Sequence, residues 1–249
     1  MSKIKILGLA IMAMFAFSVV GASSASAAEW GLCKDVAGKT GEFEDSLCTK
    51  LTAVPGTGLY EFEKLTAAIP VHGKTVGKLK LTDMGAPGGA STIECEGTLE
   101  GSVGPGKEDS VTKTTTTSCV RVSGSCEAGH AITAEPLNLP WKTELLLEGG
   151  KVRDMIMNGG KGTPGWKVEC TVLGFVKIQD ECTGETTTGV SVVKEAEKHL
   201  VHFTFDGISN EKPANCSLGG EKQGLVEGLI SILPNTGGGE GDILTVGPV

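Results

Sequence analysis

The 249-residue chain contains few aromatic residues and has no long apolar run beyond its first 20 residues. Aromatic side chains make up 4% of the chain, with one Tyr and three Trp, so little large apolar surface is available for a core. The longest later apolar stretches, such as 145–147 and 171–178, have the length of a strand. A membrane-spanning helix needs about 20 apolar residues, so no transmembrane segment is expected after residue 28.

Positive charge is also scarce, since 22 Lys and Arg face 30 Asp and Glu, for a net charge of −8. Binding to nucleic acid requires clustered Lys and Arg against the phosphates, so no nucleic-acid partner is expected. The same acidity disfavours adhesion to anionic lipid head groups and supports solubility.

The start of the chain has the order of a secretory signal peptide. Lys3 and Lys5 precede an apolar run over residues 6–20, and small residues fill 21–28. The alternative is an uncleaved anchor, but the apolar run is shorter than the roughly 20 residues of a spanning helix. We therefore assign 1–28 as a signal peptide and expect a secreted or extracellular protein, with the cell envelope as one location.

Eight cysteines follow the expected cleavage site, and an even number in an exported chain is typical of a disulfide framework. Metal binding is the alternative, but there is no C-x-x-C and no cysteine pair near a spaced His pair. We therefore expect no metal or other cofactor, and disulfides at all eight positions: Cys33, Cys48, Cys95, Cys119, Cys126, Cys170, Cys182 and Cys216.

The pairing of these cysteines is biased by proximity along the chain. Cys33 and Cys48 flank a glycine-containing segment that can turn back as a hairpin, and Cys126 follows turn residues 123–125 that come soon after Cys119. We therefore expect Cys33–Cys48 and Cys119–Cys126. The other four cysteines would pair among themselves, with Cys170–Cys182 and Cys95–Cys216 as the first choice.

The dominant pattern along the mature chain is that of short strands separated by Gly- and Pro-rich turns. Polar and apolar residues alternate over 92–100 and 166–172, which places Cys95 and Cys170 on inward faces. Helix is expected only as one turn at 194–198, and 60–68 is ambiguous. Further strands are expected at 76–82, 110–122, 132–139, 142–148, 152–157, 186–193, 199–205 and 225–232.

The predicted fold class is therefore all-β, a disulfide-stapled β-sandwich or barrel-like domain or domains with little helix. We divide the mature chain into an N-terminal cysteine hairpin segment (29–68), a first β unit (69–136) and a second β unit (137–249), or read 29–249 as one globular domain. Residues 93–95 and 168–170 echo each other, which indicates either two related units or a chance likeness of short strands.

Several landmarks resemble a group of uncharacterised, cysteine-rich secreted proteins of actinobacterial type with many paralogues. The resemblance spans most of the mature chain, and it implies no activity, ligand or catalytic residue. The matching segments are 30–33 (WGLC), 48–49, 55–62 (PGTGLYEF), 93–95, 119–126, 138–145 (NLPWKTEL), 164–174 (PGWKVECTVLG) and 180–183.

No catalytic motif is assembled in the sequence, so no catalytic residue is assigned. There is no G-x-S-x-G elbow, and none of the four histidines (His72, His130, His199 and His202) is placed beside a nucleophile. His199 and His202 are three apart, so on a strand they point to opposite faces and share no metal. The acidic clusters at 42–45 and 180–181 are interpreted as solvated surface rather than as a glycosidase pair.

Two further patterns have a functional and a structural interpretation. Trp30, Trp141 and Trp166 are candidates for a sugar-stacking platform. Packing is favoured, because large aromatic side chains dominate burial in a core that contains so few of them. Residues 233–237 (LPNTG) resemble a sortase signal. No apolar segment or basic tail follows them, so a turn is favoured.

The sequence favours a non-enzymatic extracellular structural or binding protein, for which cell-envelope components are the candidate partners. The alternative is a secreted hydrolase whose site forms from distant residues. A pocket that holds a histidine with two carboxylates would favour the hydrolase.

We predict that the exported protein begins at Ala28 or Glu29, because the positive residues, the apolar run and the small residues occur in that order. Amino-terminal sequencing of the secreted protein checks this. A sequence that starts at Met1 would exclude cleavage.

Overall fold

A computed structural model describes residues 28–195, 198–205, 213–234 and 243–247. In these ranges it contains sixteen strands in two sheets and no helix, which confirms the all-β prediction. No helix in these ranges has the length and apolarity needed to cross a membrane.

The strands follow the alternating segments of the sequence, and each of the ten predicted strands corresponds to an observed one. The ambiguous segment 60–68 contains a strand, β2. Five further strands were not predicted: β1, β3, β11, β14 and β16. The bounds are β1 Trp30–Asp35, β2 Tyr60–Lys64, β3 Ile69–Thr75, β4 Leu79–Asp83, β5 Ser91–Val103, β6 Glu108–Ser123, β7 Thr133–Leu137, β8 Trp141–Glu148, β9 Lys151–Asn158, β10 Gly165–Val172, β11 Val176–Thr183, β12 Thr186–Glu195, β13 Lys198–Phe205, β14 Ala214–Cys216, β15 Gly220–Pro234 and β16 Ile243–Val246.

Eight strands of the large sheet pair in a ring. The order is β13-β12-β9-β8-β6-β5-β3-β15, and β15 pairs again with β13 from Val201↔Ile232 to Phe205↔Gly228. All of these pairings are antiparallel. The ring gives the fold its barrel-like character, because one face of every strand points inward.

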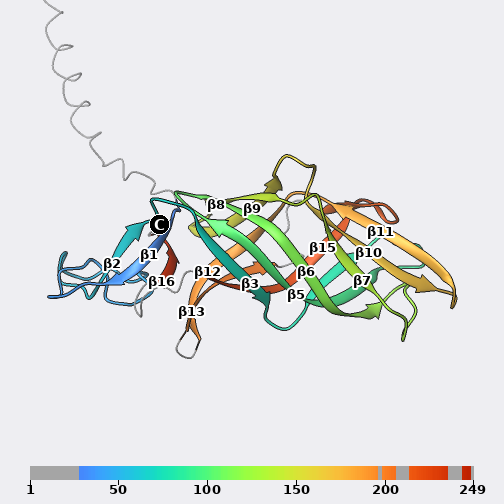
Figure 1. Cartoon of the computed structure of the whole chain (residues 1–249), viewed down its shortest axis with the longest axis horizontal. Coiled ribbons are helices and arrows are strands. Elements are labelled where there is room, and N and C mark those ends of the chain that lie inside the picture. Colours follow the sequence, from blue (N-terminus) through green and yellow to red (C-terminus); the bar gives the residue numbers. More distant parts are fainter. Residues whose placement is uncertain (1–27, 196–197, 206–212, 235–242, 248–249) are drawn as a thin grey trace, which may run out of the picture.

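The remaining strands of the large sheet form a second group that shares three strands with the ring. β4 lies between β5 and β15, and β14, β11, β10 and β7 continue outward from β15. β7 approaches β6 through a hydrogen bond from Thr116 Oγ1 to the Ala134 carbonyl. The shared strands β5, β6 and β15 are long, with 13, 16 and 15 residues, and they run along the elongated molecule (Figure 1).

These pairings cross the expected boundary between residues 136 and 137. β15 from the second β unit pairs with β3 and β4 from the first, and β8 pairs with β6. The two expected units therefore interleave in one sheet.

The small sheet has the order β16-β1-β2 and lies at one end of the molecule (Figure 1). β1 and β2 come from the 29–68 segment, whereas β16 comes from the other end of the chain and pairs from Trp30↔Val246 to Cys33↔Ile243. The segment therefore needs the carboxy-terminal strand to complete its sheet.

Alternation along the strands builds the core. Ile93, Cys95 and Leu99 are buried on β5, while Glu94, Glu96 and Glu100, each next to one of them, are more exposed. A larger apolar cluster joins the ring to the small sheet, and a smaller one that contains Cys95, Cys126 and Cys170 lies in the second group. The predicted inward positions of Cys95 and Cys170 are confirmed.

All eight cysteines form disulfides, and the expected Cys33–Cys48 bond is confirmed. The other expected pairs are wrong. The structure contains Cys95–Cys119, Cys126–Cys170 and Cys182–Cys216 instead of Cys119–Cys126, Cys170–Cys182 and Cys95–Cys216.

The physical reason is strand pairing. Cys182 and Cys216 face each other in the β11–β14 ladder, with Cα atoms 4.0 Å apart. Cys119 on β6 lies against Cys95 on the adjacent β5, with Cα atoms 4.1 Å apart. Cys126, in the loop after β6, forms its disulfide with Cys170 on β10. The pairing of these cysteines is therefore set by which strands lie side by side and not by proximity along the chain.

Three local expectations also change or fall outside the described ranges. The helical turn expected at 194–198 is wrong where it is described, because Lys194 pairs with His199 across β12 and β13. Leu233 and Pro234 of the LPNTG motif end β15 in pairing with β3, and residues 235–237 lie outside the described residues. The signal-peptide residues 1–27 also lie outside them.

We predict that Cys126→Ala/Cys170→Ala lowers the free energy of unfolding by about 4 kcal/mol, because the bond closes a 44-residue separation that limits the unfolded chain. Urea unfolding of the oxidised protein measures the loss. A peptide map without reductant is expected to recover Cys126 linked to Cys170. Cys126 linked to Cys119 would contradict the pairing.

Candidate functional site

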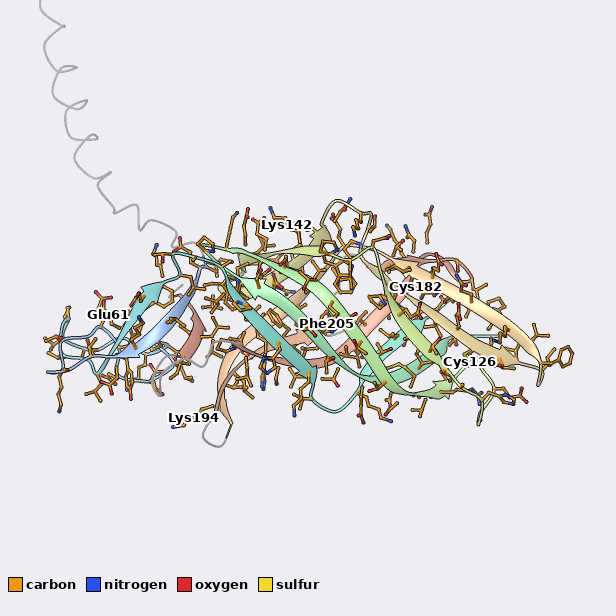
Figure 2. All side chains as sticks on the ribbon, in the orientation of Figure 1. Glu61, Cys126, Lys142, Cys182, Lys194 and Phe205 are labelled. Atoms are coloured by element: carbon orange, nitrogen blue, oxygen red, sulfur yellow. A yellow bond between two sulfur atoms is a disulfide. The ribbon has the colours of Figure 1, made fainter. Side chains whose placement is uncertain are left out.

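A cavity of about 180 Å³ lies inside the large sheet, between the ring and the second strand group. Its wall is mostly apolar, because the inward positions of the alternating strands meet there. Phe205, one of the lining residues, is labelled in Figure 2. Apolar lining residues of the ring include Val71, Leu99, Val103, Ile156, Phe203 and Ile232.

Two carboxyl groups belong to this otherwise apolar wall. Asp109 on β6 and Asp154 on β9 both line the cavity and are 8% and 3% exposed. β8 lies between them and contributes the buried hydroxyl of Thr143, which faces Asp109 in the ladder. Thr188 on β12 faces Asp154 and is also buried. The four side chains make one polar patch in the ring.

Trp30 holds one of these carboxyl groups from outside the ring. Its indole Nε1 donates to Asp109 Oδ2 at 3.0 Å, and its ring packs edge-on against Phe203 with centroids 6.3 Å apart. The main chain of Trp30 is bonded too, since its N–H donates to the Gly106 carbonyl and its carbonyl accepts from Leu65. The side chain is 0% exposed, so the first strand of the small sheet is fixed against the ring.

Burial makes both carboxyl groups weak acids. It raises the pKa of Asp109 to about 9, with a further increase from the charge of Asp154, while the hydrogen bond from Trp30 acts in the opposite direction. Burial likewise raises the pKa of Asp154 to about 7, against a hydrogen bond from the Glu144 backbone. The Oδ1 atoms of Asp109 and Asp154 have no hydrogen-bond partner among the described residues.

No histidine side chain in the described part of the chain lines this cavity. His72 is exposed on β3, and His130 lies in a loop, with Nε2 3.7 Å from Glu127 Oε2. His202 is buried on β13 but alternates with the cavity residue Phe203, so it lies on the other face of the strand. The side chain of His199 lies outside the described residues.

The acidic clusters noted in the sequence have structural roles. Asp45 accepts hydrogen bonds from the backbone N–H groups of Thr49 and Lys50 and so fixes the turn after Cys48. Glu42, Glu44 and Glu181 are exposed, as a solvated surface requires.

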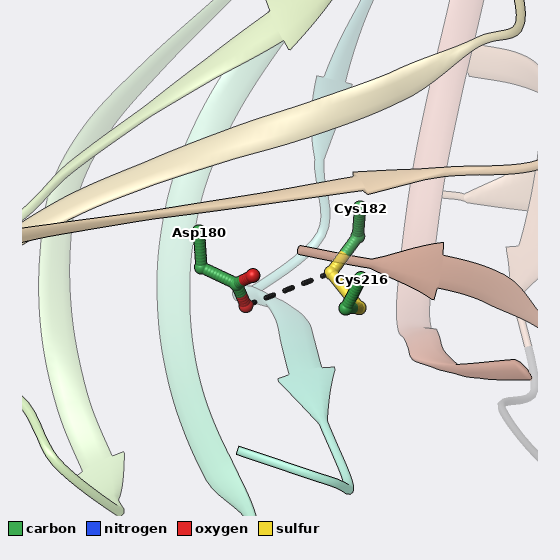
Figure 3. A group of neighbouring side chains, drawn as sticks. All are labelled: Asp180, Cys182 and Cys216. Carbon is green, nitrogen blue, oxygen red and sulfur yellow. Dashed lines mark hydrogen bonds between the residues drawn. A yellow bond between two sulfur atoms is a disulfide. The ribbon is translucent and has the colours of Figure 1, made fainter. Parts of the chain in front are cut away.

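Asp180 lies beside two cysteines in an arrangement that resembles a metal site. Figure 3 shows its carboxylate next to Cys182 and Cys216, with Oδ2 3.7 Å from Cys182 Sγ. The two sulfurs are bonded to each other, so they offer no thiolate to a metal. Oδ1 of Asp180 accepts from Ser217 and Leu218, which fixes the loop after β14.

The three tryptophans do not form one platform. Trp30 is buried, which confirms the packing interpretation for it. Trp141 and Trp166 are half-buried and border the cavity, and the Trp141 indole donates to the Leu137 carbonyl at 2.7 Å.

Asp109 and Asp154 were missed in the sequence, although Asp154 had a usable signal. In the strand 151–158 the inward positions are Val152, Asp154 and Ile156, so a charged residue stands in an apolar row. Asp109 had no such signal, because it precedes the regular part of its strand between Glu108 and Ser110.

No known family model matches this chain, and no curated protein or solved structure matches it either.

We predict that the protein loses stability as pH rises from 5 to 8. The folded-state pKa of each buried carboxyl is raised, so the stabilising contribution is complete below the unfolded-state pKa near 4 and is lost as pH rises toward the folded-state value. The slope approaches about 1.4 kcal/mol per pH unit for each group. Asp154→Asn should flatten the profile in urea unfolding between pH 5 and 7, and the exposed variant Glu221→Gln should not. An unchanged slope in Asp154→Asn would contradict the assignment.

Proposed function

We propose that the protein is exported and works as a non-enzymatic binding protein that holds a small, mostly apolar molecule in its interior cavity. The cavity between the ring and the second strand group is the observation that carries this proposal. An apolar cavity of about 150 Å³ is large enough for benzene, so about 180 Å³ accommodates a single ring with a short side arm.

Export is supported by two independent features. The first 28 residues have the composition of a signal peptide, and four disulfides are typical of an oxidising compartment. The sequence landmarks also support membership of the uncharacterised secreted group of actinobacterial type, which we include in the proposal.

A secreted hydrolase is the second candidate. The observation that favours it is the presence of Asp109 and Asp154 in one cavity with pKa values near 9 and 7, since an acid and a base require separated pKa values. The absence of a described histidine from the lining weighs against it. Recovery of an unchanged ligand from the protein would support binding, and recovery of cleaved product would support hydrolysis.

We predict that filling the cavity weakens binding of an apolar probe. Val111 on β6 lines the cavity, so Val111→Phe is expected to reduce the affinity for toluene at least tenfold in calorimetric titration. Val122 lies on the same strand but is 53% exposed and outside the lining, so Val122→Phe is the matched control and should bind like the unmodified protein. Equal affinities in the two variants would contradict the cavity as the binding site.

A further inference from the structure

We propose that the molecule held in the cavity carries an ammonium group, which lies against Asp109 and Asp154 while its apolar body fills the remaining space. This inference rests on the proposed binding function and adds the chemical class of the ligand.

The first argument is the unmet hydrogen-bonding capacity of the two carboxyl groups. Each is more than nine-tenths buried, each lines the cavity, and each has an Oδ1 atom with no partner among the described residues. A buried polar atom without a partner destabilises the protein, and more so when it is charged. A ligand with several N–H donors at this point satisfies both atoms, because an ammonium group provides up to three.

The second argument is the sign of the charge at this end of the cavity. The charged groups that act on Asp109 are Asp154 and Glu144, and Glu144 also acts on Asp154. All are acidic, and the cation Lys107 is paired with Glu144. The third neighbour, the Trp30 indole, is neutral. A carboxylate ligand would therefore be repelled, whereas a cation is favoured.

Other charged residues border the cavity away from this pair. Lys74, Glu96 and Glu135 line it from β3, β5 and β7, and all three are exposed. They face solvent, which screens them, so the buried pair dominates the field felt by a ligand inside the cavity.

Binding of an ammonium group has a consequence that a neutral ligand lacks. In the empty protein near neutral pH, Asp109 holds a proton, and Asp154 holds one part of the time. One ammonium charge favours one carboxylate in the pair, so its binding releases up to one proton to the solvent. The affinity should therefore rise with pH over the range in which the carboxyl groups still hold protons.

The test uses the mature, oxidised protein and three probes of similar size: 2-phenylethylamine, 2-phenylethanol and phenylacetate. Calorimetric titration at pH 6.5 in two buffers of different ionisation enthalpy gives both the affinity and the number of protons released. We expect the amine to bind at least tenfold more tightly than the alcohol, with release of up to one proton, and the acid to bind most weakly. Between pH 5.5 and 7.5 the affinity for the amine should increase, and that for the alcohol should stay constant.

Variants that remove one carboxyl charge test the role of the charge separately from the role of the apolar cavity. Asp154→Asn should remove at least nine-tenths of the preference for the amine and leave alcohol binding intact, and Glu221→Gln should change neither. If Asp154→Asn fails to fold, Asp109→Asn serves as the second variant. Its amide oxygen can still accept the hydrogen bond from Trp30.

The outcomes distinguish this inference from the function it rests on. Equal binding of amine and alcohol without proton release would overturn the ammonium assignment and leave the cavity as an apolar binding site. Binding of the amine that persists in Val111→Phe would place it outside the cavity and overturn the inference. Failure of all three probes, together with toluene, would overturn both proposals.

Discussion

The hydrogen bond from Trp30 to Asp109 joins the small sheet to the ring, and much of the structure depends on it. Trp30 lies on the first strand of the small sheet, whereas Asp109 lies on the inner face of β6. The indole both satisfies one oxygen of a buried carboxyl group and packs against Phe203 across the ring. It therefore joins the amino-terminal segment, the longest strand and β13 in one contact. Because β16 pairs with β1, the carboxy-terminal strand is fixed by the same contact.

The three long strands β5, β6 and β15 carry the rest of the architecture. At one end each contributes to the ring, and at the other end each contributes to the second group. The two apolar clusters therefore share walls, and the cavity lies where those walls meet. A chain with so few aromatic residues leaves such a space unfilled, since small and β-branched side chains line much of it. The disulfides compensate by joining neighbouring strands and loops of the second group and of the small sheet.

The same scarcity of large side chains explains why two carboxyl groups matter here. In a fully packed core, Asp109 and Asp154 would be buried against apolar atoms at a high cost in free energy. Beside a cavity, their free oxygens face a space that a ligand can enter. A binding function in which the ligand supplies the missing donors accounts for both the empty volume and the unpartnered atoms.

The sequence by itself determined the fold class, most of the strands, the inward faces of Cys95 and Cys170, and the Cys33–Cys48 bond. These follow from local alternation and turn chemistry, which act between residues close in the chain. Three disulfides, the ring and the site were decided only by the tertiary structure. Cys126 and Cys170, or Asp109 and Asp154, are separated by 44 or 45 positions, and no local rule states which strands become neighbours. The order of pairing is set by how the whole chain buries its apolar faces, and that order places two carboxyl groups on the wall of one cavity.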